Sequence, residues 1–324
     1  SGDTYDRLAL AFEVKDLLVT PMVDFLHSGQ TSDDDPGLAV YPDPFDRDDN
    51  DDAWRFAVSL ARIDTEEQAR RRLDDGGWVL NWGGLIAWLH QSRDVVTAAK
   101  GSDPEALDPS DFEVRRAGIF TPDLWASFRW RKLRVEAEAA AVLGSFLDAT
   151  DEPAVLLRQW GAALESEYRT LKADALALGV DAGIASGDDA PGFGSRPGSR
   201  FDLPQFGGKD RTWNNFVFDR DYRIDLLLWR QVLLGVTDAA YVAPHISYRP
   251  SGRTGGGGTD TGFELAARVV YSHALHANAA VLPGAPEGAA PGNPLGLELD
   301  LRLGYRAEDG FEVALDYGFL LPLS

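Results

Sequence analysis

The sequence contains no cysteine, only one methionine and only five histidines among its 324 residues. Without cysteine the chain forms no disulfide, no thiolate metal site and no cysteine nucleophile. The histidines are scattered and form no cluster of metal ligands. Long apolar runs are also missing, since no stretch approaches the about 18 continuous apolar residues of a membrane-spanning helix. The sequence therefore excludes a helical membrane span.

Basic residues are scarce relative to acidic ones. The chain has 31 Lys and Arg against 52 Asp and Glu, which gives a net charge of -21. A nucleic-acid-binding protein needs a basic stripe that displaces counterions, so nucleic acid is excluded as a partner. The chain begins at Ser1 without a charged and then apolar leader. We expect that a signal peptide has been removed or lies outside this sequence.

Alternating apolar and polar residues are the strongest positive signal. Between Gly296 and Leu321, apolar residues occupy every second position on both sides of a turn at Ala307–Gly310. Because successive side chains of a strand point to opposite faces, this segment predicts a hairpin with one apolar and one charged face. Each arm has about the 9–11 residues that a tilted strand needs to cross a bilayer.

The same alternation recurs along the whole chain and, with the final hairpin, predicts about twelve strands. The fold expected is all-β, a single domain over residues 1–324 that forms an antiparallel up-and-down transmembrane β-barrel. The other predicted strands lie at residues 8–14, 19–25, 54–60, 80–88, 124–131, 135–144, 160–168, 176–184, 242–249 and 263–272.

Short and long connections alternate between these strands. The long loops are expected at residues 29–52, 92–122, 187–237 and 278–294. Outer-membrane barrels have short periplasmic turns and long external loops, and this sorting favours a barrel over a soluble sheet. With the long loops outside, both chain ends also lie outside. We therefore expect a strand to be missing at each end, in a barrel of about 14 to 18 strands.

Two segments depart from the strand pattern. Glu66–Leu73 predicts a helical turn in a short connection. Asp219–Gly235 is too densely apolar for a strand with one wet face. We expect it to form a short amphipathic helix folded into the barrel mouth, and the alternative is a further strand covered on both faces. Its residues Asp225, Trp229 and Arg230 are the candidate constriction.

The charged face of the predicted strands supplies the candidate lumen residues, which would set selectivity. Its charges are mixed, so the sequence predicts no ion preference. The candidates are Arg7, Glu13, Lys15, Arg55, Arg129, Arg131, Glu136, Glu138, Asp181, Glu264, Arg268, Glu298, Asp300, Arg302, Glu312 and Asp316.

Carboxylates two residues apart, such as Glu136 and Glu138, share one strand face and suit acid/base chemistry on glycans. Polar-inward alternation demands such residues in any barrel, so we interpret them as lumen residues. The sequence therefore predicts neither enzyme activity nor a cofactor.

The acidic segment Asp33–Asp52 imitates part of a calcium loop. Asp51 stands where an EF-hand needs glycine, and Ala57 stands where it needs glutamate, which excludes that motif. Two interpretations remain. One is a loosely bound Ca²⁺ that bridges surface lipopolysaccharide, and the other is a solvated acidic loop. The candidate ligands are Asp46, Asp48 and Asp52.

Several short motifs carry a family resemblance. The tract Gly183–Asp189 resembles the strand-to-loop junction of alginate-export-like outer-membrane porins. Asp225–Arg230, with Thr237–Ala239 and Tyr241, resembles an uncharacterised outer-membrane β-barrel family known mainly from myxobacteria. The resemblance implies a Gram-negative outer-membrane location and members that extend beyond both ends of this chain. The partners it implies are membrane lipids, lipopolysaccharide and the barrel assembly machinery. It implies no established substrate.

Three functions are compatible with these patterns. The first is a porin-like channel for passive transport of ions, small solutes or oligosaccharides. The second is a non-conducting barrel with a structural or adhesive role. The third is a soluble β-sandwich that acts on carbohydrates. The large apolar face argues against the third, because soluble proteins rarely expose apolar patches above a few hundred Å².

Overall fold

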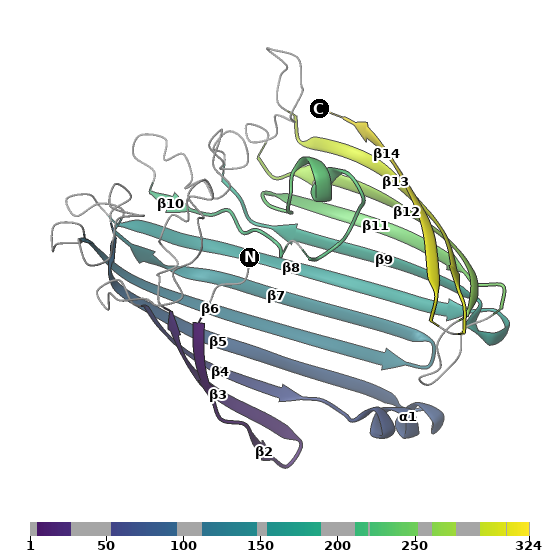
Figure 1. Ribbon diagram of the computed structural model, residues 1–324, viewed down its shortest axis with the longest axis horizontal. Coiled ribbons are helices and arrows are strands. Elements are labelled where there is room, and N and C mark those ends of the chain that lie inside the picture. Colours follow the sequence, from purple (N-terminus) through teal and green to yellow (C-terminus); the bar gives the residue numbers. More distant parts are fainter. Residues whose placement is uncertain are drawn as a thin grey trace.

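The computed structural model is a single β-sheet of 14 strands with short helical elements at its margin and on one face (Figure 1). No helix among the residues it describes is long and apolar enough to cross a membrane. The structure describes residues 5–26, 53–95, 112–147, 154–188, 211–219, 221–251, 261–276, 292–308 and 310–323.

The strands follow the chain in order around the sheet. They are β1 (Tyr5–Ala9), β2 (Phe12–Val14), β3 (Leu17–Leu26), β4 (Ala53–Arg62), β5 (Trp78–Val95), β6 (Phe112–Trp130), β7 (Leu133–Phe146), β8 (Val155–Thr170), β9 (Leu176–Ala185), β10 (Thr212–Trp213), β11 (Ala239–Tyr248), β12 (Gly262–Ala274), β13 (Pro294–Arg306) and β14 (Glu312–Pro322). The helical elements are α1 (Glu66–Asp74), η3 (Lys172–Asp174) and η4 (Leu228–Val232).

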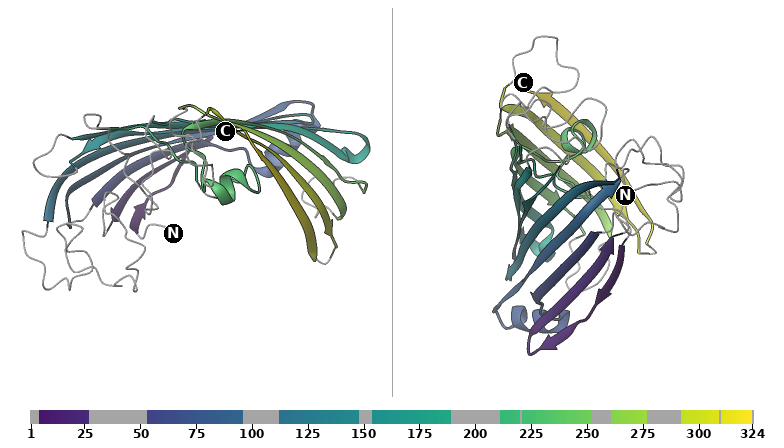
Figure 2. Two further views of the ribbon diagram at one scale, coloured as in Figure 1. Left: turned by 90° about the horizontal axis from the view of Figure 1, so that it is seen from above. Right: turned by 90° about the vertical axis from the view of Figure 1, so that its left-hand side faces the viewer.

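Neighbouring strands pair antiparallel along the path β1-β3-β4-β5-β6-β7-β8-β9-β11-β12-β13-β14. The strand β2 pairs with β3, and β10 adds a short parallel pair to β8. This confirms the predicted all-β, antiparallel, up-and-down fold. The sheet bends into an arch whose two edges, β1 and β14, are not joined (Figure 2). The closed barrel of about 14 to 18 strands therefore stays a prediction.

The outer, convex face of the arch is apolar over every part of the sheet. On β13, Leu297, Leu299, Leu301 and Leu303 are between 38% and 46% exposed. On β14 the apolar residues are more exposed still, with Leu315 at 68%. The predicted sorting into an apolar and a charged face is thus present. The apolar side chains lie on the outside of the arch instead of forming a buried core.

The connections lie as the loop sorting predicts, with one correction. The strands β6 and β7 meet in a turn at residues 131–132, whereas β9 and β11 are separated by residues 186–238. The strand β1 begins and β14 ends at the end of the sheet with the longer connections, which we call the long-loop end. The long loop predicted at residues 92–122 is wrong in its extent, because β5 continues to Val95 and β6 begins at Phe112. Their ladder pairs Val95 with Phe112, so sheet hydrogen bonding overrides the polar composition.

The predicted helical turn at Glu66–Leu73 is confirmed as α1. Thr65 caps its first turn, and Thr65 and Gln68 exchange hydrogen bonds between side chain and backbone in a capping box. This satisfies two amides that the first turn of a helix leaves unpaired. The helix closes the connection between β4 and β5 at the end of the sheet opposite the long-loop end.

Candidate functional site

Residues 219 and 221–236, which we call the insert, lie against the concave face of the arch (Figures 1 and 2). The insert belongs to the connection between β9 and β11 and contains one helical turn, Leu228–Val232. The predicted short helix is present and the alternative strand is wrong, whereas its place in a barrel mouth stays a prediction because the sheet is not closed. The helical part is shorter than expected, because most of the insert is irregular.

The side chain of Glu298 on β13 holds the start of the helical turn. Its Oε1 accepts hydrogen bonds from the backbone N–H groups of Leu226 at 3.0 Å and Leu227 at 2.7 Å. Its Oε2 accepts from the N–H of Leu228 at 2.9 Å. Glu298 is only 1% exposed. One buried carboxylate therefore satisfies three consecutive amides and fixes the insert to the sheet.

Asp225 fixes the same turn from within the insert. Its carboxylate oxygens accept hydrogen bonds from the N–H groups of Trp229 at 2.9 Å and Arg230 at 3.2 Å. Burial raises the pKa of Asp225 to about 7, and the negative charge of Glu298 adds to the shift. The two amide hydrogen bonds oppose this shift, since they favour the ionised carboxylate.

Arg268 on β12 joins the insert to a second strand. Its Nη1 donates to the backbone oxygen of Ile224 at 2.8 Å, and its Nη2 donates to Asp181 on β9 at 2.9 Å. The Nδ1 atom of His245 on β11 lies 3.4 Å from the same Asp181 carboxylate. Three strands and the insert thus share one network of charged side chains.

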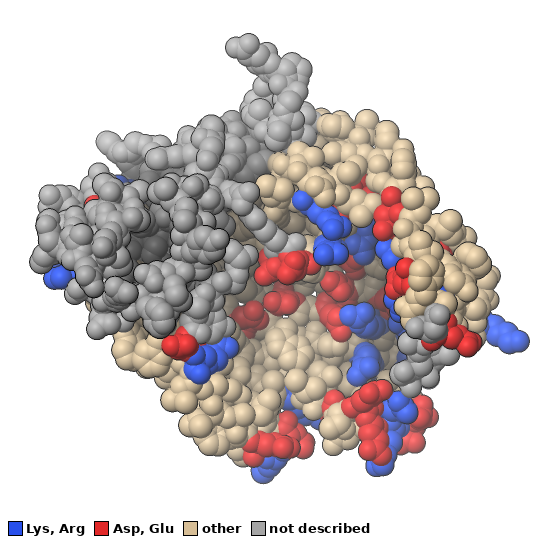
Figure 3. Space-filling view, in the orientation of Figure 1, with Lys and Arg blue, Asp and Glu red and all other residues tan. Residues whose placement is uncertain are grey.

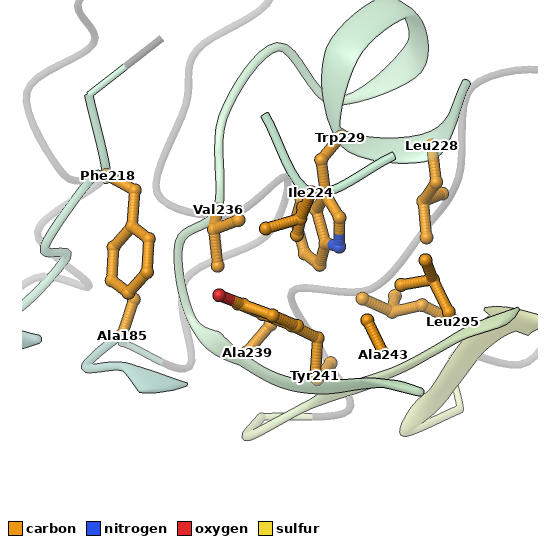
Figure 4. Packing of buried hydrophobic residues seen from close by; sticks show 12 residues of the cluster. Ala185, Phe218, Ile224, Leu228, Trp229, Val236, Ala239, Tyr241, Ala243 and Leu295 are labelled. Atoms are coloured by element: carbon orange, nitrogen blue, oxygen red, sulfur yellow. The ribbon is translucent and has the colours of Figure 1, made fainter. Parts of the chain in front are cut away.

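Apolar packing completes the attachment of the insert (Figure 4). Leu228 and Trp229 point toward the sheet and pack with Leu295 in a buried cluster. The indole Nε1 of Trp229 donates to the hydroxyl of Ser272 at 2.9 Å. Because buried polar groups are costly without partners, this bond fixes the orientation of the ring. The insert is therefore a packed part of the structure.

Glycine residues of the sheet leave space for the insert and for the ring that supports it. A Cβ on Gly318 would lie 3.1 Å from Cγ of Leu227. A Cβ on Gly183 would collide with the ring of Tyr241. The hydroxyl of Tyr241 makes a 2.8 Å hydrogen bond with that of Tyr222 in the insert. Glycine at these positions permits close approach of the insert and its supporting ring.

A row of carboxylates continues across the concave face beyond the insert. Glu165 on β8 is paired in register with Asp181, and Glu136 on β7 is paired with Glu165. Further along, Glu138 on β7 and Asp123 on β6 are diagonal neighbours on the same face of the strand pair. Figure 3 shows acidic side chains gathered in the hollow of this face.

The charges in this row are unevenly compensated. Glu136 forms an ion pair with Arg134. Within the described part of the chain, no Arg or Lys forms an ion pair with Asp123, Glu138 or Glu165. The row therefore presents negative charge to whatever occupies the hollow of the concave face.

A second charged cluster lies near the other edge of the arch. Asp24 on β3 is fully buried between two arginines. Arg7 on β1 donates to both of its oxygens, at 2.7 and 3.0 Å, and Arg55 on β4 donates at 2.7 Å. Both arginines stand directly opposite Asp24 in the strand registers. Cross-strand pairs of opposite charge stabilise this edge of the sheet.

Most predicted lumen residues lie together on the concave face. Lys15 and Arg131 instead lie in turns, where each has a positive φ. The guanidinium of Arg131 stacks over the ring of Trp130, 4.8 Å from its centroid. The others are on strands, and alternation places them on the face that carries Glu298. These residues are Arg7, Glu13, Arg55, Arg129, Glu136, Glu138, Asp181, Glu264, Arg268, Glu298, Asp300, Arg302, Glu312 and Asp316.

The three predicted constriction residues differ in solvent exposure. Asp225 and Trp229 of the insert are buried, whereas Arg230 is exposed. Sequence reasoning missed Asp24, Asp123 and Ser272 as members of these networks. Asp123 falls between the long loop predicted at residues 92–122 and the strand predicted from residue 124, and a serine carries no distinct signal in a strand.

Metal binding finds no support in the described part of the chain, where no group of three or more His, Asp or Glu residues is arranged to hold a metal ion. The candidate calcium ligands Asp46, Asp48 and Asp52 lie outside the described residues.

No protein-family model matches the chain. No curated protein matches it either. The resemblance to outer-membrane barrel families therefore stays a prediction.

Proposed function

We propose that this chain forms the wall of a bacterial outer-membrane β-barrel that works as a porin-like channel for passive transport. Its convex face would contact lipid, and its concave face would line the lumen. The insert would narrow that lumen from one side. The partners would be outer-membrane lipids, lipopolysaccharide and the barrel assembly machinery.

The apolar convex face is the observation that carries this proposal. Leucine and aromatic side chains on every second position are exposed along the whole arch. In water such a face would be far larger than the few hundred Å² that soluble proteins expose. In a bilayer the same face is favourable, and the polar concave face is what a water-filled barrel requires. A soluble carbohydrate-active domain would leave this face unexplained.

The carboxylate row on the concave face supports passage of cations. Asp123, Glu138 and Glu165 form no ion pair with Arg or Lys among the described residues. Rings of Asp and Glu favour cations in channels, because they replace part of the ion's hydration with negative charge. We propose a preference for cations and small neutral solutes over anions.

Conductance in planar bilayers tests the channel directly. We expect stable open steps from the refolded protein, and a reversal potential in a salt gradient that indicates cation preference. Replacing Asp123 and Glu138 by Asn and Gln, together with Glu165→Gln, should lower that preference several-fold. An anion-selective pore would contradict the charge assignment. A barrel that inserts but stays silent would favour the structural or adhesive alternative.

The assignment of the two faces has its own test. Leu301→Arg places a charge on the convex face of β13, where it should cost roughly 2–4 kcal/mol in a bilayer. Ala314→Arg places the same charge on the concave face of the neighbouring β14 and should insert like the wild type. Equal insertion of both variants into vesicles would contradict the assignment of the convex face to lipid.

A further inference from the structure

The insert contains a cavity of about 240 Å³, and every residue that lines this cavity belongs to the insert. The volume exceeds the about 150 Å³ of an engineered protein cavity that binds benzene. It is smaller than the about 300–1,000 Å³ that is typical of sites for drug-sized ligands. The cavity therefore has room for a small organic molecule.

Part of the cavity wall is apolar. Ile224, Trp229 and Val236 line it and belong to the buried cluster of Figure 4. Leu234 lines it as well and is 53% exposed. The indole N–H of Trp229 already donates to Ser272, so the ring offers the cavity only its apolar surface. Contact with the apolar body of a ligand would remove this surface from water.

Four charged residues also line the cavity, and the protein itself satisfies only one of them fully. Both carboxylate oxygens of Asp225 accept backbone N–H groups. Arg223 and Arg230 are exposed, and neither guanidinium forms an ion pair or a hydrogen bond with the part of the chain that the structure describes. Asp219 accepts the N–H of Asp221 at 2.8 Å with one oxygen, and it forms no ion pair with any described Arg or Lys.

Opposite charges that line one cavity without pairing set the insert apart from the sheet. On the concave face of the strands, Arg249, Arg268 and Arg302 each form an ion pair with a carboxylate. In the cavity, the guanidinium groups and the Asp219 carboxylate stay apart. A ligand with a carboxylate at one end and an ammonium group at the other would satisfy both kinds of charge, because guanidinium groups donate to carboxylates and carboxylates accept from ammonium.

We propose that the insert binds a small zwitterion with an apolar body, of the chemical class of an α-amino acid such as leucine. Its carboxylate would lie at Arg223 and Arg230, and its ammonium group would lie at Asp219. This inference names a ligand class for the insert, and it rests on the proposed function for the route by which the ligand would reach the cavity. A zwitterion has no net charge, so the carboxylate row of the concave face would not repel it as it would repel an anion.

Leucine and three analogues test the charge arrangement on the wild-type protein. Titration calorimetry on the refolded full chain in detergent micelles measures each affinity without any current. We expect leucine to bind. N-acetyl-leucine lacks the ammonium group and leucinamide lacks the carboxylate, so each should bind at least about tenfold more weakly. Glycine keeps both charges but lacks the apolar body, and it should also bind at least about tenfold more weakly.

Variants of the exposed charges test the assigned contacts. Arg223→Gln and Arg230→Gln should each weaken leucine binding about tenfold, and the second keeps the backbone N–H that Asp225 accepts. Asp219→Asn should weaken leucine binding about tenfold. It should leave the affinity for N-acetyl-leucine unchanged, because that analogue has no ammonium group to lose its partner. A purely structural role of Asp219 would lower both affinities alike.

The matched control is Arg302→Gln, which makes the same substitution on the concave face outside the cavity. Arg302 is paired with carboxylates of β14, and the variant should keep the leucine affinity within about twofold, since a screened charge acts only over a short range. Denaturant unfolding of each variant confirms that a lost affinity is not a lost fold.

Three results would overturn the inference. They are a wild-type protein that does not bind leucine, an analogue lacking one charge that binds as tightly as leucine, and a control variant that loses as much affinity as the cavity variants. Conductance is recorded separately on the same preparations. A silent protein that binds leucine would contradict the channel and keep the site, whereas a conducting protein that does not bind leucine would do the reverse.

Discussion

The two charged clusters of the concave face are built from the same residue types but are opposite in balance. Around Asp24, one buried carboxylate lies between two guanidinium groups. Around Glu298, the carboxyl groups of Asp225 and Asp300 are also buried, and the guanidinium of Arg268 donates to the insert backbone and to Asp181 instead of to these three. The strand registers explain the difference, since Arg7 and Arg55 stand directly opposite Asp24, whereas Glu298 stands between apolar residues. A carboxylate that the sheet leaves unpaired becomes an attachment point for another segment.

Among the changes that test this difference, Glu298→Ala should have the largest effect on stability. It leaves three backbone N–H groups without their acceptor, which should lower the free energy of unfolding by roughly 3 kcal/mol. Denaturant unfolding of the refolded protein measures the loss. Glu312→Gln is the control, because the exposed Glu312 of β14 pairs with Arg302 and Arg306 of β13 and its loss should change stability far less. Equal losses would argue against Glu298 as the attachment point.

Asp24→Asn should have the next largest effect. It leaves Arg7 and Arg55 without their shared carboxylate, but both guanidinium groups reach solvent, at 38% and 21% side-chain exposure. We expect a loss of about 2 kcal/mol, below the range for fully buried pairs. Hydrogen exchange should show the change in β1 and β3 and leave the insert protected. Loss of protection in the insert would contradict the independence of the two clusters.

The stability of the insert should depend on pH through Asp225. Its pKa is raised from 3.8 to about 7 in the folded chain, so the folded state holds this proton more firmly than the unfolded one. The stabilisation is fully present below about pH 4 and is lost as pH rises through about 7, with a slope of at most about 1.4 kcal/mol per pH unit. Unfolding between pH 4 and 8 measures that slope.

Asp225→Asn should remove this contribution. Asp219→Asn, an exposed change in the same segment, should retain it. A slope that is unchanged in Asp225→Asn would place its origin in another group.

Ser272→Ala should have the smallest effect. It removes the acceptor of the Trp229 indole and should cost about 1 kcal/mol. Denaturant unfolding measures the loss, and a double-mutant cycle with Trp229→Phe should show a coupling energy of about 1 kcal/mol beyond the cavity cost of the smaller ring. Additive losses would show that the hydrogen bond contributes nothing of its own.

The fold was largely predictable because alternation survives in every strand. The outward leucines of β13 and the turn at Ala307–Gly310 are local patterns that strand geometry fixes. The end of the β5–β6 hairpin was not predictable. Its polar composition is typical of loops, yet Arg93 pairs with Val114 and Glu113 pairs with Asp94 in the strand ladder.

The sequence predicted which residues belong to the candidate site, but it did not predict which of them form hydrogen bonds with one another. Alternation assigned Glu298, Asp300 and Arg268 to one face, and dense apolar content marked the insert as exceptional. That Glu298 accepts the amides of Leu226–Leu228 depends on contacts about 70 residues apart in the chain, and no local pattern encodes such a distance. The Asp24 cluster was missed for the same reason, since Asp24 and its two partners lie on three different strands.

Because the strands differ in length, the sheet extends further at some strands than at others. The strands β5 and β6 have 18 and 19 residues, against 10 each in β9 and β11. At the long-loop end, β8 continues for six residues, Val155–Trp160, beyond its pairing with β9. That extension is about 20 Å of hydrogen-bonded sheet. A bulky molecule that approaches this end would meet an extended part of the sheet beside β8 and a shorter part beside β9. The angle of approach, and not only the width of the opening, would therefore decide what enters.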